Sequence, residues 1–416
     1  MSKPSDLLSE NVVKTNPPVW LILGLTFLVM MMEGISHQGI PVLYPFIQTD
    51  LALSNSQIGL ITSTLNLMGL FVVMFGGWLA DVFGVKKVIL LSLLSVTAII
   101  AILPFAQSFI VLLLIVAIIG VANTPTAPAT SAAVSLWIPN RILGFAMSFK
   151  QTGFAVGGAI AAAILPALSL IMGWRLAGGT ISIIIVIVAI IFWIYYRDAP
   201  VKKDSPVIFS LGSFIKDIKV MVRNRRLLIC LSWGTIFGGL QWVFLSYFLL
   251  FLINNMGFSP ILAGGMLALS QIINSVSRVF WGAISDLRIF RGNRIVILVI
   301  IGVISIFTLF SFSLLKPGAS VLFIYILTIT TGLSLLAWPG MLMTVSSEMT
   351  DQNKVGATVG LMVTFYRLGV VIIPPIFGWL IDTSNSYQAG WQMAAGLALI
   401  STLILIIFGR QSPRSA

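Results

Sequence analysis

Five side chains that carry or accept charge lie inside long apolar stretches of this chain, and they are its most informative residues for chemistry. They are Glu33, His37, Lys150, Arg278 and Arg367. Placing an ionisable side chain among lipid tails is energetically costly, so such residues persist mainly where they bind or move something. Three of them are cations and only one is a carboxylate. Because an excess of fixed positive charge in a dry cavity favours an anion, we expect a small anionic substrate.

Arg278 and Arg367 are the residues expected to bind the negative group of this substrate. Gln271, Asn274 and Arg278 are spaced i, i+3 and i+7, which places them on one face of a helix. A guanidinium offers a planar fork that matches a carboxylate. Arg367 falls near the middle of its apolar stretch, next to Tyr366. The alternative is that either arginine extends to a membrane interface or pairs structurally with the interior glutamate.

Lys150 and several uncharged residues are expected to shape the same cavity. Lys150 follows the start of its stretch by about eight residues, so its long stem could instead reach the lipid headgroups. The other candidates are polar or aromatic residues of further apolar stretches: Tyr44, Asn123, Gln241, Trp242 and Trp338. For each of these, packing or hydrogen bonding between helices is the competing interpretation.

Glu33 and His37 are the expected proton carriers. They are four residues apart, so they share one face of a helix, and His37 is the single histidine of the chain. A buried carboxyl group beside an imidazole is suited to taking up and releasing a proton. The competing interpretation is a hydrogen-bonded pair that only satisfies itself.

The elements that position these residues are membrane-spanning helices. The chain has 416 residues, of which 58% are hydrophobic and 9% charged, whereas soluble domains carry about 25% charge. Uncharged apolar stretches of about 20 residues predict transmembrane helices. Hydropathy places twelve of them near 18–46, 56–79, 88–106, 109–137, 142–170, 176–196, 227–253, 259–284, 295–314, 319–342, 355–380 and 389–408. The predicted fold class is an all-α membrane protein.

An internal repeat divides these helices into two sets of six. Residues 77–87 resemble 282–294, residues 144–153 resemble 360–369, and residues 173–175 resemble 390–392, at offsets of 205, 216 and 217 residues. Repeats of this size are typical of secondary transporters. We therefore expect a six-helix bundle over 1–197, a second over 227–416, and a cytoplasmic linker over 198–226. The linker is polar and basic, and its helical periodicity favours an amphipathic helix on the membrane surface.

Basic residues indicate the orientation. Of the 24 Lys and Arg residues, three lie inside spans and 19 fall on the side that holds both termini, whereas the opposite side has only Arg175 and Lys316. By the positive-inside rule both termini are cytoplasmic, and we expect the plasma (inner) membrane of a prokaryote. The net charge of +12 then reflects topology and headgroup contact. It does not indicate nucleic-acid binding, because the basic residues are scattered over short loops.

A glycine–aspartate motif leaves the second span and is partly repeated after the eighth. The first copy reads Gly77-Trp-Leu-Ala-Asp81-Val-Phe-Gly84-Val-Lys86-Lys87. The weaker copy contributes Gly282, Asp286 and Arg288. A carboxylate at a helix end can pair with a basic residue or with a helix N-terminus of the other half, and this contact can be broken and remade. We therefore expect these residues to gate the cytoplasmic side; otherwise their charges only orient the loop.

The motif and its position resemble those of the major facilitator superfamily. Trp137-Ile-Pro139-Asn-Arg141-x-x-Gly144-x-Ala146 also resembles a helix junction of that superfamily, whereas Val82 replaces the basic residue that many members carry. The resemblance implies a rocker-switch transporter with one substrate site between two bundles. Arg278 is loosely similar to an arginine of monocarboxylate and organic-anion members, and the run 149–153 to cyanate-type members.

The remaining patterns exclude other functions. The chain shows no phosphate-binding glycine loop and no Cys/His metal motif, so we expect no ATP coupling, no cofactor, no metal and no enzymatic activity. The sequence predicts a monomeric, proton-coupled transporter of a small organic anion, in particular a monocarboxylate. The alternatives are an anion exchanger without proton coupling, or a sensor or scaffold that does not transport.

Overall fold

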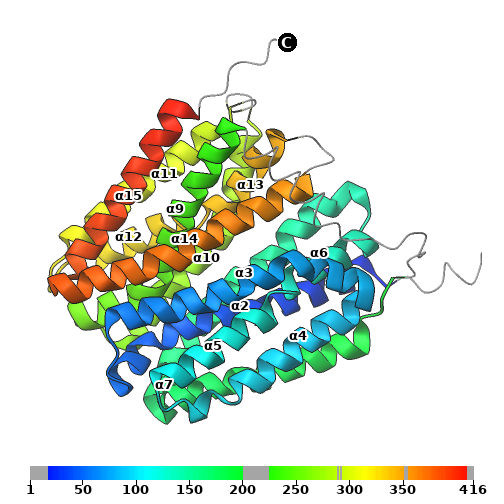
Figure 1. Cartoon of the computed structure of the whole chain (residues 1–416), viewed down its shortest axis with the longest axis horizontal. Helices are drawn as coiled ribbons and strands as arrows, with labels where there is room; N and C mark the ends of the chain where they lie inside the picture. The colour runs from blue at the N-terminus through cyan, green and yellow to red at the C-terminus, as the bar shows by residue number, and fades with distance from the viewer. Residues whose placement is uncertain (1–16, 200–223, 288–289, 291–292, 351–354, 410–416) are drawn as a thin grey trace, which may run out of the picture.

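The computed structural model describes residues 17–199, 224–287, 290, 293–350 and 355–409, without the side chains of 71–78, 81, 140 and 355–357. Within these residues the regular elements are helices (Figure 1). The amphipathic helix predicted for the linker lies almost wholly outside the described residues.

The first part of the chain forms six long helical elements. They are α2 (Val19–Asp50), α3 (Asn55–Phe83), α4 (Val85–Ile100), α5 (Phe109–Asn123), α6 (Thr126–Trp137) and α7 (Leu143–Tyr195). Two short 3₁₀ turns, η2 (Leu103–Phe105) and η3 (Asn140–Ile142), connect them. The 53-residue α7 is interrupted at Gly173, where φ is 79° and ψ is 154°. A positive φ is easily reached only by glycine, so Gly173 separates the two spans predicted for 142–170 and 176–196.

The second part of the chain repeats this plan. It contains α9 (Arg225–Leu250), α10 (Pro260–Ser285), α11 (Ile295–Leu314), α12 (Val321–Leu333), α13 (Trp338–Glu348), α14 (Val355–Ser384) and α15 (Tyr387–Phe408). A π-helical turn, η4 (Phe251–Asn255), extends α9. Helix bounds agree with the predicted spans to within a few residues. Ten stretches of the described residues are long and apolar enough to cross a membrane.

Two predicted spans are each broken into a pair of helices. The span at 109–137 is split at Thr124 and Pro125, and the span at 319–342 is split at residues 334–337. Proline is favoured in the first turn of a helix but lacks the N–H that would continue a preceding helix. Pro125 precedes α6, and Pro339 lies in the first turn of α13. The breaks therefore occur at corresponding places in the two repeats.

The helices form two groups that meet along a shared boundary (Figure 1). Helices α2–α7, coloured blue to green, form the first group, and α9–α15, coloured green to red, form the second. Across the boundary α14 packs along α3, and α10 packs along α7. Large apolar side chains are exposed on the outer surfaces, including Leu91, Ile110, Ile171 and Phe307. Such a surface suits contact with lipid tails rather than water.

The helices are connected at two opposite ends of the molecule. The Asp382 face is the end where residues 50–55, 255–260 and 384–387 connect helices, and the Arg294 face is the end where residues 83–85 and 285–295 do so. Helix α3 runs from the first face to the second, a length of about 43 Å at 1.5 Å per residue. This length is enough to cross a bilayer.

Candidate functional site

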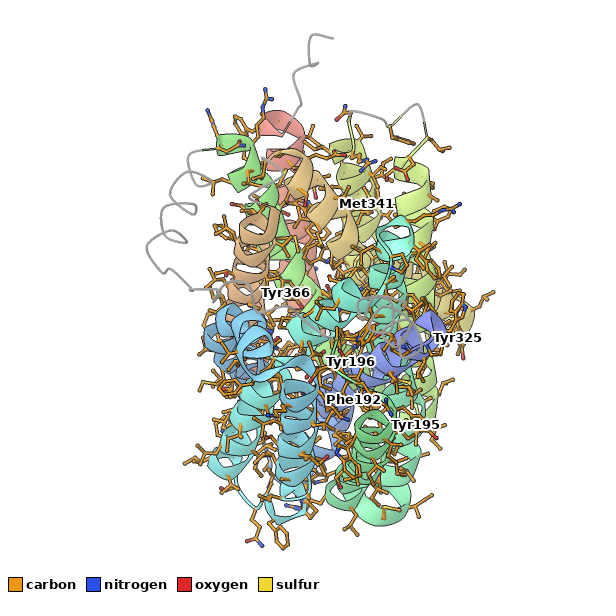
Figure 2. The ribbon with its side chains drawn as sticks, turned by 90° about the vertical axis from the view of Figure 1, so that its right-hand side faces the viewer. Phe192, Tyr195, Tyr196, Tyr325, Met341 and Tyr366 are labelled. Carbon is orange, nitrogen blue, oxygen red and sulfur yellow. The ribbon has the colours of Figure 1, made fainter. Side chains whose placement is uncertain are left out.

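The predicted site residues differ in their access to solvent. Glu33, His37, Arg278, Tyr366 and Arg367 are partly accessible. The uncharged members and Lys150 are buried: Tyr44, Asn123, Lys150, Gln241, Trp242, Gln271, Asn274 and Trp338. Figure 2 shows Tyr366 at the level where the two groups of helices meet.

Arg367 reaches from the second group into the first. Its Nη1 donates a hydrogen bond to the backbone carbonyl of Asn66 on α3, at 3.2 Å. Gly69 leaves the space for this guanidinium, because a Cβ at that position would collide with Nη1. Glu33, His37 and Tyr366 all lie within electrostatic range of Arg367. Arg367 is therefore the charge that links the predicted proton carriers to the second group.

An aromatic contact continues from Arg367 back to the first group. The Trp242 indole on α9 donates to the Tyr366 hydroxyl at 2.5 Å. The His37 ring stands edge-on to Trp242, with ring centroids 5.0 Å apart and planes at 83°. Gly238 makes room for Tyr366, since a Cβ there would approach the Tyr366 ring too closely. Three helices, α2, α9 and α14, thus converge at these three side chains.

Arg278 is held by the face on which it was predicted to lie. Its Nε donates to Asn274 Oδ1 at 3.1 Å, and Asn274 Nδ2 donates to Gln271 Oε1 at 3.2 Å. The Tyr366 hydroxyl lies within electrostatic range of both Arg278 and Arg367. Both guanidinium groups therefore act electrostatically on one phenol where the groups of helices meet.

Four predicted site residues carry buried polar atoms that lack a hydrogen-bond partner within the described part of the chain. The atoms are Glu33 Oε2, His37 Nδ1, Gln241 Oε1 and Trp338 Nε1. Buried polar groups are nearly always satisfied, because an unpaired one loses its hydration without compensation. All four atoms are available to a ligand or a water molecule, and the Glu33 and His37 side chains can also take up a proton.

Lys150 points into the first group of helices, toward α6. Its ammonium donates to Ala127 O at 3.3 Å, Thr130 Oγ1 at 3.2 Å and Ser131 Oγ at 2.8 Å, all on α6. An ammonium has three donors, so none is left for a ligand in this conformation. With 2% exposure, Lys150 is a buried charge within electrostatic range of Glu33.

Tyr44 and Asn123 make helix–helix contacts. The Tyr44 hydroxyl and Thr62 Oγ1 are 2.9 Å apart, and Thr62 continues to Ser246 Oγ at 2.8 Å. Asn123 Nδ2 donates to Ser36 Oγ at 3.0 Å. In this structure both residues make hydrogen bonds between helices.

The first gate motif is described only in part. The side chain of Asp81 and the surroundings of Gly77 lie outside the described residues. Gly84 has φ 85° and separates α3 from α4. The Lys86 backbone N–H donates to Asp198 Oδ1 at 2.9 Å. Asp198 therefore lies at the N-terminus of α4, a position that favours a negative charge.

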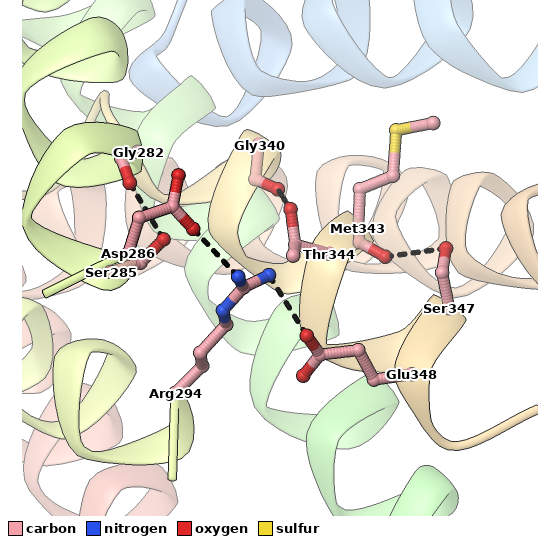
Figure 3. A network of polar contacts seen from close by, with 9 residues as sticks. All are labelled: Gly282, Ser285, Asp286, Arg294, Gly340, Met343, Thr344, Ser347 and Glu348. Atoms are coloured by element: carbon pink, nitrogen blue, oxygen red, sulfur yellow. Dashed lines mark hydrogen bonds and ion pairs between the residues drawn. The ribbon is translucent and has the colours of Figure 1, made fainter. Parts of the chain in front are cut away.

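In the second copy of the motif, the ion-pair partner of Asp286 is Arg294 (Figure 3). Arg294 pairs with Asp286 at 2.7 Å and with Glu348 at 2.8 Å, so it connects the end of α10 to the end of α13. Gly282 O accepts a hydrogen bond from Ser285. Arg288 lies outside the described residues. Exposed pairs of this kind contribute about 1 kcal/mol or less each.

The sequence reasoning missed a contact between the two groups at the Asp382 face. Asp382 Oδ1 accepts from Asn55 N and Nδ2, both at 2.9 Å. Its Oδ2 accepts from Ser56 N at 2.8 Å and Ser56 Oγ at 2.5 Å. Tyr247 OH donates to Asn55 O at 2.8 Å and lies 2.9 Å from Pro374 O. A Gly-x-x-x-Asp spacing over 378–382, like that of the gate motif, was the available signal.

Two hollows lie away from the predicted substrate residues. One of about 490 Å³ opens at the Asp382 face, and its lining includes Gln48, Asn254, Asp382 and Tyr387. A smaller one of about 150 Å³ lies between α9 and α15. Neither contains a predicted substrate-binding residue. The chemistry therefore points to the boundary between the groups, where Arg367 of the second group bonds to Asn66 of the first, and not to these hollows.

The fold and these residues define a multi-pass membrane protein of the transporter class. The family model of the Major Facilitator Superfamily matches residues 22–352. The chain belongs to the Major Facilitator Superfamily.

The curated relatives are bacterial transporters. A hexuronate transporter of Bacillus subtilis is 24% identical over 95% of each chain. A probable sulfoacetate transporter of Cupriavidus necator is 23% identical over 92% of each chain, and a probable galactarate/D-glucarate transporter of Escherichia coli is 22% identical over 94% of each.

Solved structures share the fold. A point mutant of the nucleoside transporter NupG has a TM-score of 0.80 at 14% identity, covering 93% of this chain and 100% of its own. A bacterial homologue of the human lysosomal transporter Spinster, inward-facing and unoccupied, has a TM-score of 0.76 at 18% identity, covering 96% and 100%.

Proposed function

We propose that this protein is a secondary active transporter of a small organic anion and that protons are its co-substrate. The observation that carries the proposal is that Arg278 and Arg367 both lie within electrostatic range of Tyr366, where two groups of helices meet. Glu33 Oε2 and His37 Nδ1, which lack a hydrogen-bond partner among the described residues, belong to side chains within electrostatic range of Arg367. Relatives named for hexuronate, sulfoacetate and galactarate support an anionic substrate.

The balance of charge supports a monocarboxylate moved with one proton. Glu33 lies within electrostatic range of both Lys150 and Arg367. A single negative group that enters the site would add a charge beside this carboxylate. If Glu33 takes up one proton at the same time, the net charge of the interior stays the same. Leaving that charge unchanged avoids the cost of extra charge in a low-dielectric interior.

The contacts between the groups support alternating access. Asp382 joins α14 to α3 at one face, and Gln48 joins Asn254 at the same face, at 3.2 Å. Carboxylate contacts to a helix N-terminus can be exchanged between two rigid arrangements. We propose that this face separates when the site opens toward it, and that the Gly77–Lys87 loop serves the opposite face.

We also propose the topology predicted from the sequence. Ten stretches qualify as spans, and the twelve-span count adds α3 and divides α7 at Gly173. The bundles are then 1–197 and 227–416, with the linker 198–226 and both termini in the cytoplasm of a prokaryotic cell. In this orientation the Asp382 face is external. The transporter acts as a monomer in the inner membrane.

The test begins with thermal shift of the purified protein. The panel contains glucuronate, galactarate, sulfoacetate, lactate, pyruvate, chloride and glucose. We expect at least one organic anion to raise the midpoint and glucose to leave it unchanged. Uptake of the binding anion into proteoliposomes should then require an inward proton gradient. Stabilisation by glucose alone would exclude the anion assignment, and uptake driven equally by counter-anion without a proton gradient would favour exchange.

A further inference from the structure

A chain of side-chain amides runs from Arg278 into the first group of helices. Arg278 Nε donates to Asn274 Oδ1 at 3.1 Å, and Asn274 Nδ2 donates to Gln271 Oε1 at 3.2 Å. Gln271 Nε2 donates to Gln38 Oε1 across the boundary between α10 and α2. Gln38 Nε2 then donates to the backbone carbonyl of Phe154 on α7 at 3.0 Å. Four hydrogen bonds therefore connect the guanidinium to the other group.

Every donor in this chain points the same way, from the cation toward the Phe154 carbonyl. Aligned hydrogen bonds polarise one another, and the positive charge of Arg278 strengthens the first of them. The chain occupies Nε of Arg278, while the described residues provide no hydrogen-bond partner for its two terminal nitrogens. The two terminal nitrogens of Arg278 can therefore bind a ligand, while the bond from Nε to Asn274 holds the orientation of the guanidinium.

The amides of the chain are dry. Gln38, Gln271 and Asn274 are 4%, 3% and 2% exposed. A buried amide that loses its partner is left without compensation for its lost hydration. Removing one amide therefore disturbs the others, including those on the far side of the boundary.

The backbone of α7 lies close to the Gln38 amide at Gly158. A Cβ at Gly158 of α7 would stand 2.5 Å from Gln38 Oε1 and 2.8 Å from Nε2. Glycine at 158 leaves room for the amide where it stands, and a larger residue would push the amide out of this position. Gln38 is therefore a built part of the boundary and not an incidental polar residue beside His37.

We propose that Gln38 is a positioning residue for Arg278. Acting through Gln271 and Asn274, it orients the guanidinium for the substrate anion, and it ties that orientation to the contact between α2 and α10. When the two helices separate, the chain breaks between Gln271 and Gln38, and Arg278 loses its fixed orientation. This inference rests on the proposed anion site, and it assigns that site a component from the first group of helices.

The first test is a double-mutant cycle on the ligand-free protein, so that it does not depend on the substrate. Gln38→Met and Arg278→Met are measured singly and together by thermal midpoint in detergent. Residues with no shared partner have additive effects. If the hydrogen-bonded amides couple Gln38 to Arg278, the thermal midpoint of the double variant should lie about 2 °C or more above the value given by adding the two single-variant shifts.

A matched control uses Gln388 on α15, which also donates to a backbone carbonyl, Leu315 O, at 3.5 Å. Gln388→Met combined with Arg278→Met should be additive. If the effects of Gln38→Met and Arg278→Met on the thermal midpoint add up in the same way as those of Gln388→Met and Arg278→Met, the proposal is overturned.

The second test is binding of glucuronate, galactarate and sulfoacetate by titration calorimetry. Gln38→Met should lower the affinity for the anion about tenfold in the wild-type background. In the Arg278→Met background it should lower the affinity less than twofold. Equal losses in both backgrounds would show that Gln38 acts independently of Arg278. If none of the three anions binds the wild type, the proposed function fails, and the stability cycle still decides the role of Gln38.

Discussion

Arg367 of α14 donates to the backbone carbonyl of Asn66 on α3 at 3.2 Å, which places a cation of the second group inside the first. The carbonyl is a neutral acceptor, and a substrate carboxylate would be a stronger one. If Arg367 binds the substrate as proposed, it has two competing partners, one that joins the groups and one that arrives with the substrate. This competition would let the substrate weaken a contact between the groups as it binds.

Arg278→Lys should reduce anion affinity at least tenfold. Lysine keeps the positive charge but replaces the planar fork with a point charge, and it has no Nε to anchor on Asn274. The measurement is titration calorimetry with the anion that gives the largest thermal shift. Lys316→Arg, on the opposite side of the predicted topology from the linker, is the control and should leave affinity unchanged. If Arg278→Ala keeps affinity within twofold of wild type, the anion site is elsewhere.

Most of the fold could be predicted from the sequence because it follows from apolar length and repetition. Helix α11 spans Ile295–Leu314, the range predicted from hydropathy alone. The breaks at Pro125 and at residues 334–337 were not predicted, because the apolar pattern continues through them. Hydropathy reports which residues avoid water and is insensitive to where the backbone changes direction.

For the candidate site, the sequence indicates individual residues but not the contacts between them. Buried charge in a span marks Arg278 and Arg367, since lipid penalises it wherever it occurs. Their partners depend on how separate helices meet. Asn66 contributes a backbone carbonyl, which every residue has, and Gln38 is distinguished only by the helices packed around it. For Lys150 the sequence position suggested either cavity lining or contact with lipid headgroups. Neither role predicted its hydrogen bonds to α6.

Glu33→Gln should retain exchange of labelled substrate and lose concentrative uptake. Glutamine has nearly the same shape as the protonated acid but cannot release a proton, so the site can bind substrate and cannot couple it to the gradient. If protons enter with the anion as proposed, wild-type uptake should rise as external pH falls. Proteoliposomes with a set pH difference provide the measurement.

His37→Gln is the companion variant. We expect the pH dependence of uptake to shift while transport continues, because the His37 ring packs on Trp242 beside the site and is not the single proton carrier. Uptake that is flat from about pH 5 to 8, where an ordinary histidine titrates, and unchanged in Glu33→Gln would leave anion exchange as the better account.

Asp382→Asn should loosen the Asp382 face. The carboxylate accepts four hydrogen bonds from Asn55 and Ser56 at the N-terminus of α3, where a negative charge is favoured. Asparagine loses the charge and one acceptor oxygen. Cysteines at Gln48 and Asn254, whose side chains bond at 3.2 Å, report whether the face is joined. In a Cys230→Ser background, oxidative cross-linking should fall at least twofold.

The control for this variant is Thr383→Val, since Thr383 is an exposed neighbour that bonds only to carbonyls of its own helix. It should leave the cross-linking yield unchanged. A yield that falls equally in both variants would show that the end of α14 responds to any substitution, and that Asp382 does not specifically hold the face.

Gly59→Ala should prevent α3 and α14 from meeting as closely as they do. A Cβ at Gly59 would lie 2.5 Å from Pro375 Cα and 2.6 Å from Pro374 O, which are backbone atoms that cannot rotate away. Overpacking of this kind costs about 1–3 kcal/mol, so the thermal midpoint should fall by several degrees. Gly360→Ala on α14 meets no atom within 4 Å, and its midpoint should hold or rise because alanine favours helix by about 1 kcal/mol. Cross-linking of the cysteine pair at Gln48 and Asn254 separates two outcomes for Gly59→Ala. A variant that folds but cross-links less has shifted away from this conformation. Full cross-linking with an unchanged midpoint would show that the close crossing at Gly59 is not required.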